Sequence, residues 1–133
     1  MNKSLFLKLW SLGVGAMDAL TGLLLIIAPS FVLKLLFIPS PSSESLVFQS
    51  WIGVFVMSVG LSYSWALSGR RVAGETVWGF TALVRMLVAL FLTIQITRGT
   101  LHPMWALVAA SDASVAIVQI IILWLGWWKE EKP

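Results

Sequence analysis

Three ionisable residues interrupt long apolar runs of this sequence: Asp18, Arg85 and Asp112. Two carboxylates and a guanidinium can form ion pairs, or bind a proton, a cation or the polar head of a ligand. A charged side chain at the centre of a membrane helix costs roughly 2.5–3.5 kcal/mol, so such residues face each other or a polar site. Arginine has five donors and can pair with both carboxylates. We therefore predict an Asp–Arg–Asp cluster inside a bundle of membrane helices.

The three residues are expected at one depth. Counted from the same membrane face at about 1.5 Å per residue, they lie about 15, 12 and 18 Å deep. Two aspartates against one arginine leave a formal charge of −1 inside the bundle. Two interpretations stay open at this point. The cluster is either an ion-paired clasp that fixes the order and register of the helices, or a site that holds a proton, a cation or a ligand.

Composition places these residues in a membrane protein. Of 133 residues, 59% are hydrophobic and 11% are charged, whereas roughly a quarter are charged in an ordinary soluble domain. We predict a single domain over residues 1–133. The chain has no cysteine, which excludes disulfides, thiol catalysis and Cys-bound iron–sulfur or zinc sites. Its single histidine, His102, leaves little material for a haem or metal centre, so no metal and no catalytic residue is assigned.

The apolar runs predict an all-α, integral membrane four-helix bundle with spans at residues 9–28, 46–67, 77–96 and 104–125. Pro29 should bend the chain into a short interfacial helix, with Lys34 reaching toward water. Serines of the following loop are expected to cap the second span. Gly69 suits the left-handed end of that span, where the adjacent arginines would favour a helix C-terminus. Pro103 fits the first turn of the fourth span.

Small and polar residues follow one face of each predicted span, and small residues allow membrane helices to approach closely. The first and fourth spans carry Gly15, Asp18, Ala19, Gly22 and Ala109, Asp112, Ala113, Ala116, Gln119; the second and third carry Ser50, Gly53, Met57, Gly60, Ser64 and Trp78, Thr81, Ala82, Arg85, Ala89. Further candidates for a polar lining are Ser58, Ser62, Tyr63, Gln95 and Gln119. Tryptophans near the run ends are expected at the membrane interface: Trp10, Trp51, Trp65, Trp78, Trp105, Trp124, Trp127 and Trp128.

Lysine and arginine predict the orientation. Six of them flank the membrane face that holds both termini and the second loop, and two flank the other face. The net charge of +3 therefore reports membrane topology, and a nucleic-acid partner is not expected. We predict a multi-pass protein of the bacterial inner membrane with both termini in the cytoplasm.

One further pattern combines several glycines in the first two spans with an arginine in the third and an aspartate in the fourth. These residues are Gly13, Gly15, Gly22, Gly53, Gly60, Arg85 and Asp112. In this pattern the chain loosely resembles the DoxX-like group of small bacterial four-helix membrane proteins over its whole length. The resemblance implies a membrane module associated with redox or envelope functions, and it transfers no catalytic residue.

Three functions are compatible with these features. The first is a non-enzymatic accessory or scaffold subunit that packs beside a larger membrane complex. The second is an oligomeric small transporter coupled to protons or cations through Asp18 and Asp112. The third is a module that binds a lipid, quinone or pigment headgroup at the cluster. The first is preferred because the chain has short loops and lacks catalytic groups. The expected partners are the lipid bilayer and either another membrane protein or further copies of the chain.

Overall fold

The structure, a computed structural model, describes residues 2–133 and is all-α. Its α-helices are α1 (Lys3–Ile27), α2 (Pro29–Leu35), α3 (Ser43–Ala66), α4 (Arg71–Thr97) and α5 (Ala106–Trp124), with short 3₁₀ helices η1 (Pro103–Trp105) and η2 (Trp127–Glu130). The helices α1, α3, α4 and η1 with α5 are long and apolar enough to cross a membrane. The predicted fold class is confirmed, although α1 and α4 begin six residues earlier than the predicted spans, at residues 3 and 71.

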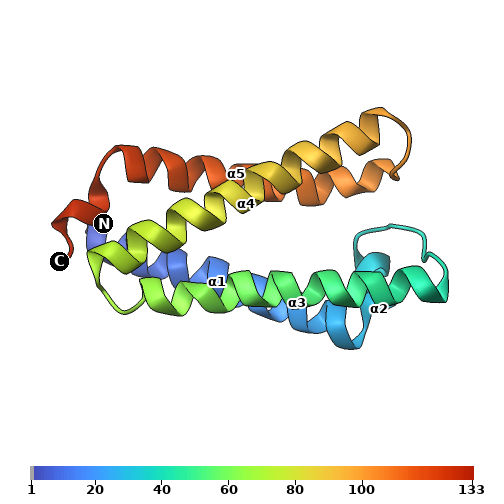
Figure 1. The fold of residues 1–133 in the computed structure, drawn as a ribbon, viewed down its shortest axis with the longest axis horizontal. Coiled ribbons are helices and arrows are strands. Elements are labelled where there is room, and N and C mark those ends of the chain that lie inside the picture. Colours follow the sequence, from blue (N-terminus) through green and yellow to red (C-terminus); the bar gives the residue numbers. More distant parts are fainter. Residues whose placement is uncertain (1) are drawn as a thin grey trace.

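The four long helices form two hairpins. The helix α1 packs along α3, and α4 packs along α5, while α3 and α4 link the two pairs. Figure 1 shows the pairs meeting at the end that holds both termini and diverging toward the opposite end, called here the outer end. Within residues 2–133, no Cα atom of α1 lies within 8 Å of a Cα atom of α4 or α5. Long side chains must therefore bridge α1 to the second hairpin.

Within the first hairpin, the backbones of α1 and α3 touch. The contact is made by four glycines, Gly15 and Gly22 on α1 and Gly53 and Gly60 on α3. A Cβ atom at Gly22 would lie 2.3 Å from the backbone nitrogen of Met57, and one at Gly60 would lie 2.3 Å from that of Ala19. Since real Cβ atoms do not approach so closely, only glycine permits this packing.

The chain bends where proline predicts it. The helix α1 ends at Ile27, and α2 begins with Pro29 in its first turn. The short helix buries Val32 and Leu33, while Lys34 is exposed. The predicted helix after the first span is thus confirmed, and its position at the membrane interface stays a prediction. In the next loop, Ser42 caps α3 by accepting a hydrogen bond from the Ser45 backbone N–H, as expected.

The prediction that the two arginines after Gly69 lie at a helix C-terminus is wrong. Gly69 does adopt the left-handed conformation, with φ +75°, after α3 has ended. Arg70 and Arg71, however, lie at the N-terminus of α4, where the helix dipole disfavours positive charge. The charge of Arg71 is compensated by Glu75, since Arg71 Nε lies 3.1 Å from Glu75 Oε1. The backbone N–H of Arg71 donates to the Lys132 carbonyl at 2.8 Å. The C-terminal tail thus holds the start of α4.

Two of the tryptophans expected near the membrane interface point into the bundle, and their depth in the membrane stays a prediction. Trp78 is fully buried, and Trp128 is 2% exposed. The Trp128 ring lies against Gly74, where an added Cβ would come within 2.1 Å of it, and meets the Trp78 ring edge-on at 5.5 Å. The chain turns back at Gly126, which has φ +73°, and so brings Trp128 inward. These rings close the bundle at the end that holds the termini.

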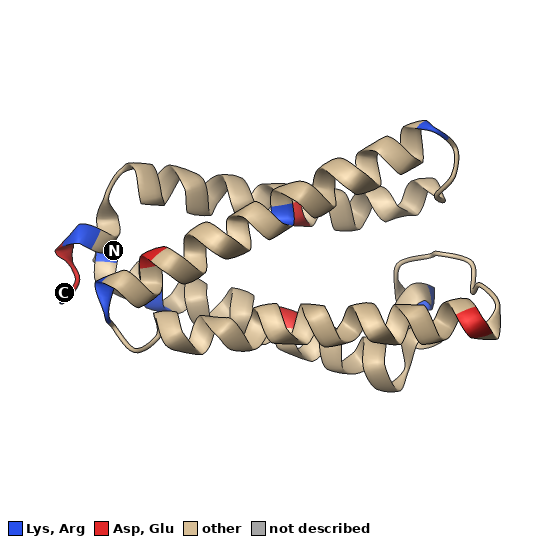
Figure 2. Ribbon diagram, viewed as in Figure 1, with Lys and Arg blue, Asp and Glu red and all other residues tan. Residues whose placement is uncertain are grey.

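Both termini lie at the same end of the bundle (Figure 1). Lys3 Nζ lies 2.7 Å from Glu130 Oε1 and joins the two terminal segments. Figure 2 shows most of the lysine and arginine at this end. Four spans with both ends together are what the predicted topology requires, and assignment of this end to the cytoplasm stays a prediction.

Candidate functional site

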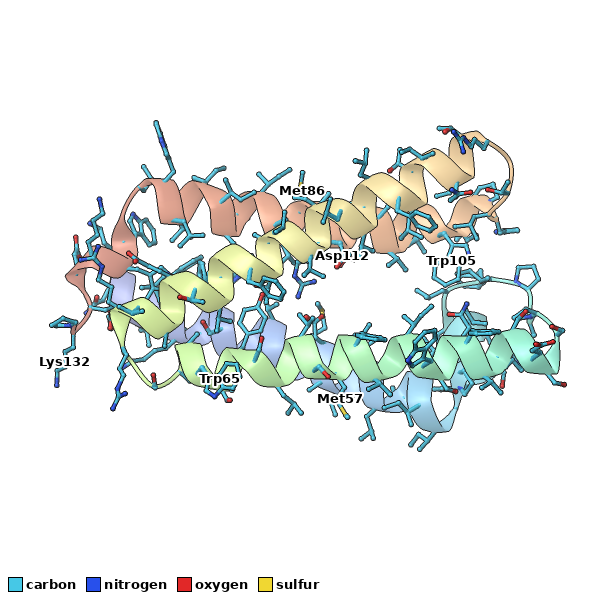
Figure 3. The ribbon with its side chains drawn as sticks, in the orientation of Figure 1. Met57, Trp65, Met86, Trp105, Asp112 and Lys132 are labelled. Carbon is cyan, nitrogen blue, oxygen red and sulfur yellow. The ribbon has the colours of Figure 1, made fainter. Side chains whose placement is uncertain are left out.

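Arg85 on α4 bridges the two hairpins at mid-length. Its Nη1 donates to Asp112 Oδ1 on α5 at 2.8 Å, and its Nη2 donates to Asp18 Oδ2 on α1. Figure 3 shows Asp112 near the middle of the long helices. The predicted meeting of one arginine with two aspartates from separate spans is confirmed. The role of the cluster beyond this contact stays a prediction.

The local sequence makes room for the charged groups. Arg85 lies between the buried alanines Ala82 and Ala89, and Asp18 lies between two buried glycines. The exposed fraction of the side chain is 5% for Arg85, 10% for Asp18 and 19% for Asp112. Removing charges from water is costly unless they are paired, so each carboxylate depends on the guanidinium. Asp112 is the member of the cluster that remains most accessible.

The cluster is not fully satisfied by protein groups. Arg85 Nε is buried and has no hydrogen-bond partner among the described residues. The second oxygens, Asp18 Oδ1 and Asp112 Oδ2, accept no hydrogen bond from residues 2–133, and neither is among the buried atoms that lack a partner. Both oxygens therefore keep some accessible surface. With all three groups ionised the cluster has a formal charge of −1, and within residues 2–133 its only ion pairs are those between Arg85 and the two aspartates.

A second polar layer lies closer to the termini and centres on the Gln119 side chain of α5. Its Oε1 accepts from Tyr63 Oη at 2.5 Å and from Trp10 Nε1 at 3.3 Å. Its Nε2 donates to the Trp78 carbonyl at 2.9 Å and to Thr81 Oγ1 at 3.0 Å. All four long helices thus meet on one fully buried amide, and all its hydrogen-bonding positions are used. We call this arrangement the Gln119 hub.

Of the residues predicted to line a polar interior, the structure brings only Tyr63 and Gln119 together. Ser58 is exposed and Ser62 half-buried, and each hydroxyl donates to a carbonyl of its own helix, at 2.7 and 2.6 Å. Gln95 lies toward the outer end, where its Oε1 accepts from Thr100 Oγ1 at 2.5 Å. The prediction of a lining role for Ser58, Ser62 and Gln95 therefore finds no support in this geometry.

One hydrogen bond between the hairpins was not predicted. Trp78 Nε1 donates to Ser11 Oγ at 2.9 Å, and both side chains are fully buried. Ser11 precedes Gly15 by four residues and Asp18 by seven, so the helical period already placed it on the inner face of α1. That spacing is the feature of the sequence that identifies Ser11.

Replacing Gln119 with leucine is expected to lower the stability of the folded protein by about 1–3 kcal/mol. The change leaves the buried groups of Tyr63, Trp10 and Thr81 without their shared partner. The measurement is thermal or denaturant unfolding in mild detergent. Gln95→Leu is the matched control, since Gln95 bonds only within its own exposed turn. An equal loss of stability in both variants would contradict a structural role of the Gln119 hub.

At the outer end, a cavity of 330 Å³ lies between the loop after α2 and the loop before α5. Its lining includes Ile38, Pro41, Gln49, Leu101, His102 and Trp105. His102 Nδ1 accepts from the Met104 backbone N–H at 3.2 Å, so this side chain caps η1. Figure 3 shows Trp105 and Asp112 on the side of their hairpin that faces the other hairpin. The cavity therefore lies on the same side of α5 as the charged cluster.

Among the described residues, no group of three or more His, Cys, Asp or Glu could hold a metal ion. The chemistry offered by the site is pairing and electrostatic binding of charge. Comparison with protein-family models, with curated proteins and with solved structures finds no match to this chain. What the geometry establishes is a four-helix membrane-type bundle whose two hairpins are joined by a buried Asp–Arg–Asp cluster.

Proposed function

We propose that this protein is a non-enzymatic accessory or scaffold subunit that packs beside a larger membrane protein in a bacterial inner membrane, with both termini in the cytoplasm. The observation that carries the proposal is the exposure of α3. In the most apolar 18-residue stretch of each helix, 11% of α3 is buried, against 33% of α1 and 39% of α4. Of the four spans, α3 thus has the smallest buried share, since the value for α5 is 22%, and the side of α3 that faces away from α1 is exposed.

The outward side of α3 carries a row of aromatic rings, called here the α3 aromatic face. Phe48, Trp51 and Phe55 are each more than half exposed, and successive ring centroids lie 6.3 and 5.8 Å apart. Rigid rings supply a large contact area at a low cost in side-chain entropy, which is why aromatic residues are enriched in the cores of protein interfaces. Ser58 follows on the exposed side, where a small polar residue permits close approach of another helix.

The interior supports the same proposal. The Gln119 amide uses all of its hydrogen-bonding positions within the fold, and the Nη1 and Nη2 of Arg85 both hold aspartates. The Gln119 amide and the two Nη atoms therefore join helices, which agrees with the role of a scaffold. The resemblance to the DoxX-like group stays a prediction, and it agrees with a module that serves a larger envelope assembly.

The α3 aromatic face can be tested by affinity purification in mild detergent. We expect the wild-type protein to retain another membrane protein, and the double variant Trp51→Ala/Phe55→Ala to recover about tenfold less of it. Removing two rings that the partner would bury should cost more than 1.4 kcal/mol of binding free energy, which corresponds to a factor of ten in affinity. The control is Trp124→Ala, which removes a ring that is 87% exposed on α5.

Three outcomes would contradict the proposal. One is a wild-type protein that purifies alone as a stable monomer. Another is a complex that contains only copies of this chain, since an accessory subunit requires a different protein. The third is equal loss of the partner in the α3 double variant and in the Trp124 control, because the contact would then not lie on α3.

A further inference from the structure

The two polar layers between the hairpins differ in one respect. The Gln119 hub is closed, because every donor and acceptor of the amide has a protein partner. The charged cluster is open, since Asp18 Oδ1 and Asp112 Oδ2 have none among residues 2–133 and keep accessible surface. With all three groups ionised, it carries one more negative than positive charge, an excess that either a proton or a bound cation removes.

The face of α5 that carries Asp112 continues toward the outer end of the bundle. Trp105, Val108 and Asp112 follow one another at helical spacing, and all three are half-buried. At about 1.5 Å per residue, Asp112 lies about 10 Å below Trp105 along the helix. Trp105 also lines the outer cavity of 330 Å³, and Figure 3 shows it on the same side of the hairpin as Asp112. One face of α5 therefore leads from the cavity to the most accessible carboxylate of the cluster.

The surroundings favour one class of cation. Hard metal cations such as Ca²⁺ and Mg²⁺ require about six or more oxygen ligands, whereas the cluster offers two unpaired carboxylate oxygens. The neighbouring positions on the path, Trp105 and Val108, are apolar, and an indole ring attracts cations to its face. An organic ammonium ion combines a positive charge with an apolar surface, and so matches both the walls and the spare charge.

We propose that the Asp18–Arg85–Asp112 cluster is a binding site for an organic ammonium ion, which enters from the outer end along Trp105 and lies against Asp112. This binding goes beyond the proposed role as an accessory subunit and does not depend on it. The bound ion brings the cluster to electrical neutrality while Arg85 keeps its two aspartates. No covalent step is involved.

The test is isothermal titration calorimetry of the full-length protein in phosphatidylcholine nanodiscs, with benzyltriethylammonium as the probe. We expect saturable binding of one probe per chain. Asp112→Asn should weaken it about thirtyfold or more, because the bound cation loses its partially buried partner. This variant still leaves one aspartate for Arg85, and its thermal unfolding should confirm that it is folded. Asp112→Glu keeps the charge and should retain binding.

Glu44→Gln is the matched control, because it removes a carboxylate that is exposed in the first turn of α3, which begins at the outer end. It should leave the affinity unchanged. Three results would overturn the proposal: no saturable binding to the wild-type protein, equal weakening by Glu44→Gln and Asp112→Asn, or displacement of the probe by potassium chloride at equal concentration. The second would indicate general surface attraction, and the third a site that does not select organic cations.

Discussion

Replacing Arg85 with leucine is expected to lower the stability of the folded protein by about 3–5 kcal/mol and to reduce its abundance in the membrane severalfold. The reason is that Asp18 and Asp112 would both lose their buried counter-ion, and an unpaired buried charge is far more costly than an absent one. Most domains have only about 5–15 kcal/mol of net stability, so a loss of this size is a large part of the total. Thermal unfolding in detergent and immunoblotting of membranes measure the two effects.

Two further variants separate pairing from general perturbation. The triple variant Asp18→Leu/Arg85→Met/Asp112→Leu should recover most of the stability, because it removes all three charges together. Arg98→Leu should have little effect, since Arg98 is exposed at the end of α4. If Arg85→Leu alone leaves the unfolding temperature and the abundance unchanged, the cluster does not join the hairpins.

Much of the site could be predicted because membrane helices impose strong local rules. An apolar run of about 20 residues defines a span, and its length then fixes the depth of each charge. The helical period places the small residues of α1 on the same face as Asp18, and those of α4 on the same face as Arg85. Since three charges at one depth have few low-cost arrangements, their mutual contact followed from the sequence.

The Gln119 hub could not be predicted in the same way. Gln95 and Gln119 both interrupt apolar runs, and although the helical period places Gln119 on the face of Asp112, it does not identify the groups that either amide contacts. Their difference depends on the rotation of α5 relative to Trp10 and Tyr63, which are far away in the chain. A glutamine has no net charge to be compensated, so no depth argument selects its partner.

The positions of Arg70, Arg71 and Trp128 could not be predicted for another reason. These positions depend on the C-terminal tail, which returns to the start of α4 after the left-handed turn at Gly126. The Lys132 carbonyl accepts from Arg71, and the Trp128 ring covers Gly74. A local pattern indicates that these residues lie near helix ends, but it does not show that the C-terminal tail packs against the start of α4.

The two hairpins are therefore built on different principles. The contact between α1 and α3 has no room for a side chain at its four glycines, whereas the contact between hairpins is made by arginine, glutamine, tyrosine and tryptophan. Close backbone contact fixes the register of α1 against α3. Asp18 lies between Gly15 and Gly22, so the same contact also fixes where the aspartate meets Arg85.

Substitution of Gly22 by alanine should consequently destabilise the protein by about 3 kcal/mol, although it adds a single methyl group. The new Cβ would lie 2.3 Å from the Met57 nitrogen and 2.6 Å from the Gly53 carbonyl oxygen, and these backbone atoms cannot rotate away. At Gly13, on the same helix, no heavy atom lies within 4 Å of an added Cβ. Gly13→Ala should instead stabilise the helix by about 0.5–1 kcal/mol. In the same unfolding assay, Gly22→Ala should thus lower the stability and Gly13→Ala should raise it.

Coupling between Gly22 and Arg85 provides the decisive comparison. If α1 shifts away from α3 in Gly22→Ala, Asp18 moves from Arg85, and part of the ion-pair energy is already lost. The double variant Gly22→Ala/Arg85→Leu should then cost less than the sum of the single variants, by about 0.5–3 kcal/mol in a double-mutant cycle. Additive effects, or a loss of stability in Gly13→Ala equal to that in Gly22→Ala, would show that the glycine contact does not position the aspartate.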